Sequence, residues 1–304
     1  MRYRFYTTDV FTDRVFGGNP LVVFPDAGGL ATETMQRIAG EFGVSETVFV
    51  FPPEQAGHTR RLRIFTPGTE LPFAGHPTIG TAYVLARTGH IALRGDATRV
   101  IFEEGVGPVP VSILWKQGTV AGARMTAPQL PILGPAPPPL SAIAHVLSLD
   151  PHDLRADDYR PEAVSCGVPF LFVPLRGRDA LRRARIDPAR WDHVMRSWWA
   201  PSIYALCFLP DGAEASLSAR MFAPGLGVVE DPATGAAVSA LAGYLAPRDR
   251  SGDGKLQWRI EQGVDMGRPS RLDLEAERSA DALVEVRVGG AAVMVSSGEM
   301  EVPG

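Results

Sequence analysis

Two ionisable residues stand in similar surroundings in the two halves of the chain. His76 precedes Pro77 and a run rich in Gly, Ala and Thr, and Asp231 precedes Pro232 and a comparable run. Glu46 is a third candidate, because it stands at the start of an apolar segment where burial favours the protonated form of a carboxyl group. Imidazole and carboxyl groups are the common acids and bases of enzymes near neutral pH. The three residues therefore predict proton transfer, with Glu46, His76 and Asp231 as the catalytic candidates.

Each of these residues also has a structural interpretation. An Asp-Pro pair before a helix is a common capping arrangement, so Asp231 would then only accept hydrogen bonds from the first turn. His76 would be a capping or packed histidine, and Glu46 an edge residue that points toward water. The equivalent positions of His76 and Asp231 favour the functional interpretation.

A repeated segment leads into both loops. Arg63–Gly68 recurs as Arg220–Gly225, with four of the six residues identical. A short repeat in each half favours a fold of two similar halves with a site between them. The helices expected after the repeats, at 78–87 and 234–246, would present free N–H groups at their N-termini. We therefore expect the two helix ends to hold a small acid.

The remaining pattern indicates an α+β protein. Short β-branched or alternating segments predict mainly antiparallel strands, and few helices are interspersed among them. Further helices are expected at 31–42, 141–148 and 188–199. The Pro-rich stretch 128–139 is interpreted as a linker, and Gly289-Gly290 as the turn of a hairpin between 283–288 and 291–297. The expected halves are residues 1–127 plus 285–304, and residues 128–284.

Composition excludes several classes of function. A net charge of −4 gives no support for nucleic-acid binding. No apolar run reaches the roughly 18 residues of a membrane helix, and the N-terminus lacks a secretory signal, so we expect a cytoplasmic protein without a membrane partner. The six histidines show no metal-ligand spacing. Lys116 and Lys255, the only lysines, lie in turn-like segments that do not suit a Schiff-base cofactor. We expect neither metal nor cofactor.

The segments around the candidates resemble the phenazine biosynthesis PhzF-like isomerase family. The resemblance is carried by 45–49, 70–78 and 230–235, with weaker matches at Phe11, 18–20 and 262–270, and so runs nearly end to end. It implies two pseudo-symmetric diaminopimelate-epimerase-like halves, each a mostly antiparallel sheet wrapped around a central helix. It also implies a homodimer that needs no cofactor and acts on a small carboxylic acid.

The resemblance further implies roles for individual residues. The best-known member isomerises trans-2,3-dihydro-3-hydroxyanthranilate by moving a proton between ring carbons. Glu46 matches the proton-shuttling glutamate of the family, and His76 and Asp231 match groups around the substrate. The implied substrate-binding residues are Asn19, Ala74, Gly75, Thr234, Gly235 and Ala236.

Departures from the family pattern leave two alternatives open. Many members have serine where this chain has Ala236, so the scaffold could serve as a catalytically silent small-acid binding protein. A racemase or lyase that depends on Cys166 is the other alternative. The two-thiol chemistry of related epimerases is excluded, because the positions that match their cysteines are Ala74 and about Pro232.

Overall fold

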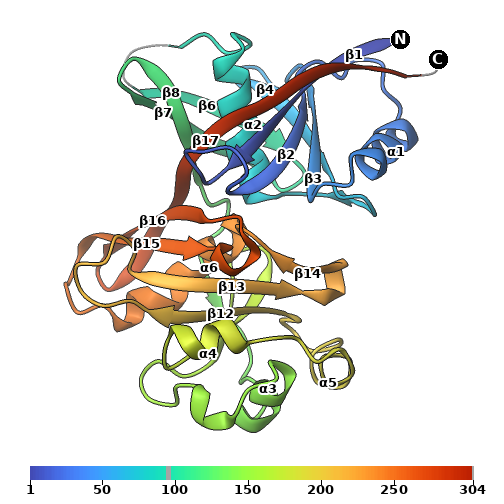
Figure 1. Cartoon of the computed structure of the whole chain (residues 1–304). Helices are drawn as coiled ribbons and strands as arrows, with labels where there is room; N and C mark the ends of the chain where they lie inside the picture. Colours follow the sequence, from blue (N-terminus) through green and yellow to red (C-terminus); the bar gives the residue numbers. More distant parts are fainter. Residues whose placement is uncertain (94–96, 303–304) are drawn as a thin grey trace. The chain divides into compact units, whose positions relative to one another are not determined.

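The chain forms two compact units, which are described separately. A computed structural model describes residues 1–93 and 97–302 (Figure 1). The first unit comprises Met1–Pro128 and Val288–Gly304, and the second comprises Gln129–Arg287. These bounds lie within three residues of the expected ones.

The strands of the first unit form a closed ring around one helix. Strand β17 pairs with both β1 and β8, and β1–β2–β3–β4–β6–β7–β8 completes the circle. The β2–β3 and β4–β6 pairs are parallel. The strands are β1 (Arg2–Val10), β2 (Asn19–Phe24), β3 (Glu46–Phe51), β4 (Arg60–Phe65), β5 (Glu70–Leu71), β6 (Ala97–Glu104), β7 (Gly107–Lys116), β8 (Thr119–Thr126) and β17 (Ala282–Glu301).

Helix α2 (Gly75–Arg87) lies inside this ring and contacts β1, β2, β3, β7 and β8. Every residue from Gly75 to Ala86 is buried. Small residues make this position possible, since a Cβ on Gly80 would come within 2.6 Å of side-chain atoms of Val10 and Leu21. Helix α1 (Thr32–Phe42) instead buries one face, on which Met35 and Ile38 pack against aromatic residues of β2 and β3.

The second unit repeats this topology. Its strands follow the order β9–β10–β11–β12–β13–β15–β16, with β11–β12 and β13–β15 parallel. Helix α6 is the counterpart of α2 and contacts β10, β11 and β16. The strands are β9 (Ile132–Leu133), β10 (Glu162–Ser165), β11 (Pro169–Pro174), β12 (Ser202–Phe208), β13 (Leu217–Ala223), β14 (Val228–Asp231), β15 (Gly254–Gln262) and β16 (Ser270–Ser279). The helices are α3 (Leu140–Val146), α4 (Arg178–Arg183), α5 (Pro188–Val194) and α6 (Gly235–Leu245), with 3₁₀ turns at Pro151–Asp153, Pro224–Leu226, Ala246–Arg248 and Val264–Met266. The shared order of parallel and antiparallel pairs confirms the expected α+β fold of two similar halves.

The repeated segment has the same structural task in both units. Arg63 donates two hydrogen bonds to Glu70, at 2.7 and 2.6 Å, and its guanidinium lies 5.2 Å from the ring centre of Phe65. Arg220 donates two hydrogen bonds to Glu230, both at 2.7 Å, and its guanidinium lies 5.0 Å from the ring centre of Phe222. Each arginine thus ties strand β4 or β13 to the short strand, β5 or β14, that leads into the central helix.

Replacing these two arginines with methionine is expected to have unequal effects on stability. The Arg220 and Glu230 side chains are 5% and 15% exposed, whereas those of Arg63 and Glu70 are 22% and 38% exposed. Arg220→Met leaves a mostly buried carboxylate without its partner, so the free energy of unfolding should fall by about 3 kcal/mol. For Arg63→Met we expect about 1 kcal/mol or less. Urea denaturation of both variants measures the difference, and equal losses would contradict this explanation.

Several expected elements are wrong. Gly289 and Gly290 form no turn, because β17 runs through both. A Cβ on Gly289 would lie 2.8 Å from Cβ of Arg124, and one on Gly122 would lie 2.0 Å from the carbonyl oxygen of Gly290, so the glycines allow β8 and β17 to approach closely. The Pro-rich stretch is not purely a linker, since strand β9 lies within it and pairs with β10.

Candidate active site

Glu46 and His76 meet at one edge of the first unit. Parallel strands β2 and β3 begin there, with Leu21 opposite Glu46, and His76 lies in the first turn of α2. The Glu46 Oε2 and His76 Nε2 atoms are 3.1 Å apart. Their side chains are 16% and 6% exposed, so the contact is largely shielded from water.

Burial determines the protonation of His76. It lowers the pKa of the imidazole to about 3, an effect that a hydrogen bond to the Pro20 backbone partly offsets. Proline has only a carbonyl to offer, so the ring must donate this bond. Nε2 faces Glu46 and has no aligned hydrogen bond, which leaves Nδ1 as the donor to Pro20. The neutral ring therefore presents the Nε2 lone pair to Glu46.

This arrangement suits the transfer of one proton. A lone pair and a carboxylate oxygen repel each other at 3.1 Å unless a proton lies between them. The pair is therefore expected to hold one proton, which the Glu46 carboxyl can give up and take back. His76 is fixed in orientation by its hydrogen bond to the Pro20 carbonyl.

In the second unit, Asp231 belongs to a hydrogen-bonded network. The Thr234 hydroxyl donates to its Oδ2 at 2.6 Å. Gln262 is fully buried and joins both ends of the loop, since its Nε2 donates to the Asp231 carbonyl at 2.8 Å and its Oε1 accepts from the Thr234 backbone N–H at 3.3 Å. Tyr204 donates to the same Oε1 at 3.0 Å. The network fixes the loop before α6.

The two loops are not matched in the expected way. Helix α2 begins at Gly75 and helix α6 at Gly235, so His76 corresponds to Ala236. Asp231 ends strand β14 and corresponds to Leu71 of β5. The expected equivalence of His76 with Asp231 is therefore wrong, and so is the expectation that Asp231 caps the helix, because the N-cap residue is Thr234.

The other expected substrate-binding residues lie around these helix ends. Ala74 is the N-cap residue of α2, and Thr234 is the N-cap residue of α6. The second position that matches an epimerase cysteine is therefore Thr234, rather than the expected position near Pro232. Asn19 starts strand β2 next to Pro20 and is fully buried. Gly75 and Gly235 are the first residues of their helices, and Ala236, the second of its own, is partly exposed. The sequence does not reveal the roles of Pro20 and Gln262, although 18–20 and 262–270 are among the segments that resemble the family.

Cys166 is unsuited to acid–base chemistry. The thiol is buried and donates to the Gln129 carbonyl at 2.8 Å. Burial raises its pKa to about 12, so it remains a neutral thiol near neutral pH. The Cys166-dependent alternative thus lacks a thiolate.

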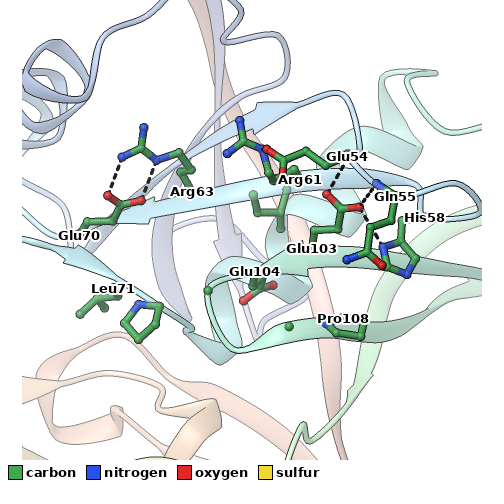
Figure 2. A pocket seen from close by; sticks show the side chains of 14 residues that line it. Glu54, Gln55, His58, Arg61, Arg63, Glu70, Leu71, Glu103, Glu104 and Pro108 are labelled. Carbon is green, nitrogen blue, oxygen red and sulfur yellow. Dashed lines mark hydrogen bonds and ion pairs between the residues drawn. The ribbon is translucent and has the colours of Figure 1, made fainter.

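A cavity of about 550 Å³ lies in the first unit, bordered by 54–63, 70–72 and 103–108 (Figure 2). Neither Glu46 nor His76 lines it. Across residues 1–93 and 97–302, no group of three or more His, Cys, Asp and Glu side chains is arranged to hold a metal ion. In the same part of the chain, no helix combines the length and apolarity needed to cross a membrane.

Comparisons with known proteins agree with this fold. A family model described as phenazine biosynthesis-like protein matches residues 8–298. An uncharacterized isomerase of Mesorhizobium japonicum is 41% identical over 295 residues, which cover 96% of both chains. The trans-2,3-dihydro-3-hydroxyanthranilate isomerase of Pseudomonas aeruginosa is 36% identical over 295 residues, which cover 95% of both. The crystal structure of a PhzF-family phenazine biosynthesis protein of Bacillus anthracis matches with a TM-score of 0.89 at 26% identity, over 99% of this chain and all of that one.

Proposed function

Because this chain is an isomerase of the phenazine biosynthesis-like (PhzC-PhzF) family, we propose that it moves a proton between two carbons of a small unsaturated or cyclic carboxylic acid. Glu46 gives its proton to one carbon and takes a proton back from the other, and the neutral ring of His76 accepts a hydrogen bond from the Glu46 carboxyl before and after the two steps. The observation that carries the proposal is the 3.1 Å contact between Glu46 Oε2 and the neutral ring of His76.

The proposed reaction balances in protons and electrons. A C–H bond breaks at one carbon and its electron pair becomes the new π bond, while the electron pair of the old π bond forms the C–H bond at the other carbon. The carboxyl group ends in the protonation state in which it began, so no external acid, base or oxidant is consumed. A single carboxyl group can serve both carbons if they lie on the same face of the substrate.

The substrate carboxylate is proposed to bind at helix N-termini. Ala74 and Gly75 at α2, and Gly235 and Ala236 at α6, present backbone N–H groups, and a helix N-terminus favours negative charge. The Thr234 N–H donates to Gln262, so Thr234 is proposed to border the substrate without donating this N–H. Asp231 is proposed to orient a polar group of the substrate, with its own position fixed by Thr234 and Gln262. A 2,3-dihydro-3-hydroxyanthranilate-like acid is the first substrate to test.

A binding protein without catalysis is the second candidate. Ala236 supports it, because a methyl group stands in the first turn of α6 where many family members have a hydroxyl. The intact Glu46–His76 pair favours catalysis over this alternative.

Incubation with candidate acids in D₂O distinguishes the two. We expect deuterium from solvent in the recovered acid, detected by mass spectrometry, together with conversion to the isomer. Cys166→Ala should leave the exchange rate unchanged, because its neutral thiol faces a backbone carbonyl. An acid that raises the melting temperature but gains no deuterium would support the binding protein instead, and exchange lost in Cys166→Ala would support the thiol.

A further inference from the structure

We propose that the neutral carboxyl group of Glu104 is a positioning element of the active site, which donates a hydrogen bond to Thr78 and so fixes the first turn of α2 that carries His76. Glu104 ends strand β6 and is not among the residues assigned to the reaction. The inference rests on the proposed function for its effect on activity, but the protonation of Glu104 can be measured without a substrate.

The distances around the Thr78 hydroxyl favour a proton on Glu104. Thr78 Oγ1 lies 2.8 Å from the Ala74 carbonyl oxygen and 2.7 Å from Glu104 Oε1. A hydroxyl group has one hydrogen, and a backbone carbonyl can only accept. If Thr78 donates to Ala74, then Glu104 must donate to Thr78. An ionised Glu104 would leave one of these two close oxygen pairs without a hydrogen.

The surroundings of Glu104 favour the same state. The residue is 8% exposed, and its Oε2 atom is buried without a hydrogen-bond partner. Burial raises the pKa of this carboxyl to about 8, and only a hydrogen bond donated by Thr78 to the ionised carboxylate would oppose this shift. The carboxyl is therefore mainly protonated at neutral pH.

The charged side chains that border the same cavity as Glu104 pair with one another (Figure 2). On β4, Arg61 pairs with Glu54 at 3.2 Å and Arg63 pairs with Glu70. His58 and the adjacent Glu103 pair at 2.9 Å. On α2, His76 is neutral and contacts Glu46. Within the described residues Glu104 forms no ion pair, so no cation compensates for its ionisation.

Loss of this proton would act on the active site through one turn of helix. The Thr78 hydrogen would turn toward the new carboxylate, and the Ala74 carbonyl would lose its hydroxyl partner while keeping the Thr78 backbone N–H at 3.2 Å. Ala74 precedes Gly75 and His76 directly. The expected consequence is a looser placement of His76 against Glu46, and a fall in kcat/KM as pH rises through about 8.

Three variants test the proposal. Glu104→Gln retains a neutral N–H donor to Thr78, Glu104→Leu removes it at similar volume, and Glu41→Gln, on the exposed side of α1, is the matched control. The first measurement is a ¹³C NMR titration of glutamate side-chain carboxyls, in which the signal lost in Glu104→Gln identifies the group. We expect this signal to titrate near pH 8, and titration near the ordinary value for glutamate would overturn the proposal.

The second measurement is the pH profile of kcat/KM. Glu104→Gln is expected to rescue near-wild-type activity at pH 7 and to lose the alkaline decline, whereas Glu104→Leu should lose about tenfold at pH 7. An unchanged alkaline decline in Glu104→Gln would overturn the positioning role. If no acid is turned over by the wild type, the proposed function fails while the carboxyl titration still decides the state of Glu104.

Discussion

Replacing Glu46 with glutamine is expected to lower kcat/KM by about 10²- to 10⁴-fold, the usual contribution of a positioned acid–base group. Glutamine preserves the length and shape of the side chain, but it cannot give up and take back a proton at neutral pH. Its amide N–H can still donate to the Nε2 lone pair of His76, so the local contact survives. Turnover of the acid identified by deuterium exchange measures the effect.

The stability of this variant separates lost chemistry from lost folding. Because the contact with His76 is retained, we expect the free energy of unfolding to remain within about 1 kcal/mol of the wild type. Deuterium incorporation should disappear together with turnover, since both depend on the same carboxyl group. Glu46→Asp keeps the carboxyl one methylene farther away and should recover part of the activity. Activity within about threefold of wild type in Glu46→Gln would remove Glu46 from the reaction.

The sequence predicts the two halves well because patterning and repetition are local properties. Arg63 and Arg220 mark the same strand in each unit, and the small residues after His76 and Asp231 mark the central helices. The pairing of His76 with Asp231 fails for a physical reason. The segment between Gly225 and α6 is longer than the segment between Gly68 and α2, and no residue type reveals how a loop divides its length between strand and turn.

Contacts between segments distant in the chain were beyond prediction. A glycine pair serves a tight turn or a close backbone approach equally well, and only the position of β8 beside β17 shows which applies to Gly289 and Gly290. In the sequence, Glu104 likewise has the pattern of an ordinary carboxylate at the end of a strand. Burial in the folded chain, beside Thr78 from 26 positions earlier, makes it a neutral acid.

Replacing His76 with asparagine is expected to reduce kcat/KM by about 10- to 100-fold while largely preserving stability at neutral pH. The asparagine amide N–H lies in a position similar to Nδ1 and can keep the bond to the Pro20 carbonyl. The variant has no counterpart of Nε2, so the Glu46 carboxyl loses the acceptor of its hydrogen bond. His76→Phe removes both ring nitrogens and leaves the Pro20 carbonyl without this donor. We expect the free energy of unfolding to fall by about 1–3 kcal/mol more than in His76→Asn.

The same pair of variants tests the protonation state of His76. In the folded protein its pKa is lowered to about 3, whereas in the unfolded chain it lies near 6.5. Below pH 6.5 the unfolded state therefore binds a proton that the folded state does not, and stability is lost as pH falls toward 3. The slope contributed by this one group is at most about 1.36 kcal/mol per pH unit. In His76→Asn, the contribution of His76 to the pH dependence of stability should be absent between pH 6 and about 4. Urea denaturation at each pH measures this difference. An unchanged slope would mean that His76 is protonated in the folded protein, and the proton shared with Glu46 would then have to be assigned to an ion pair instead.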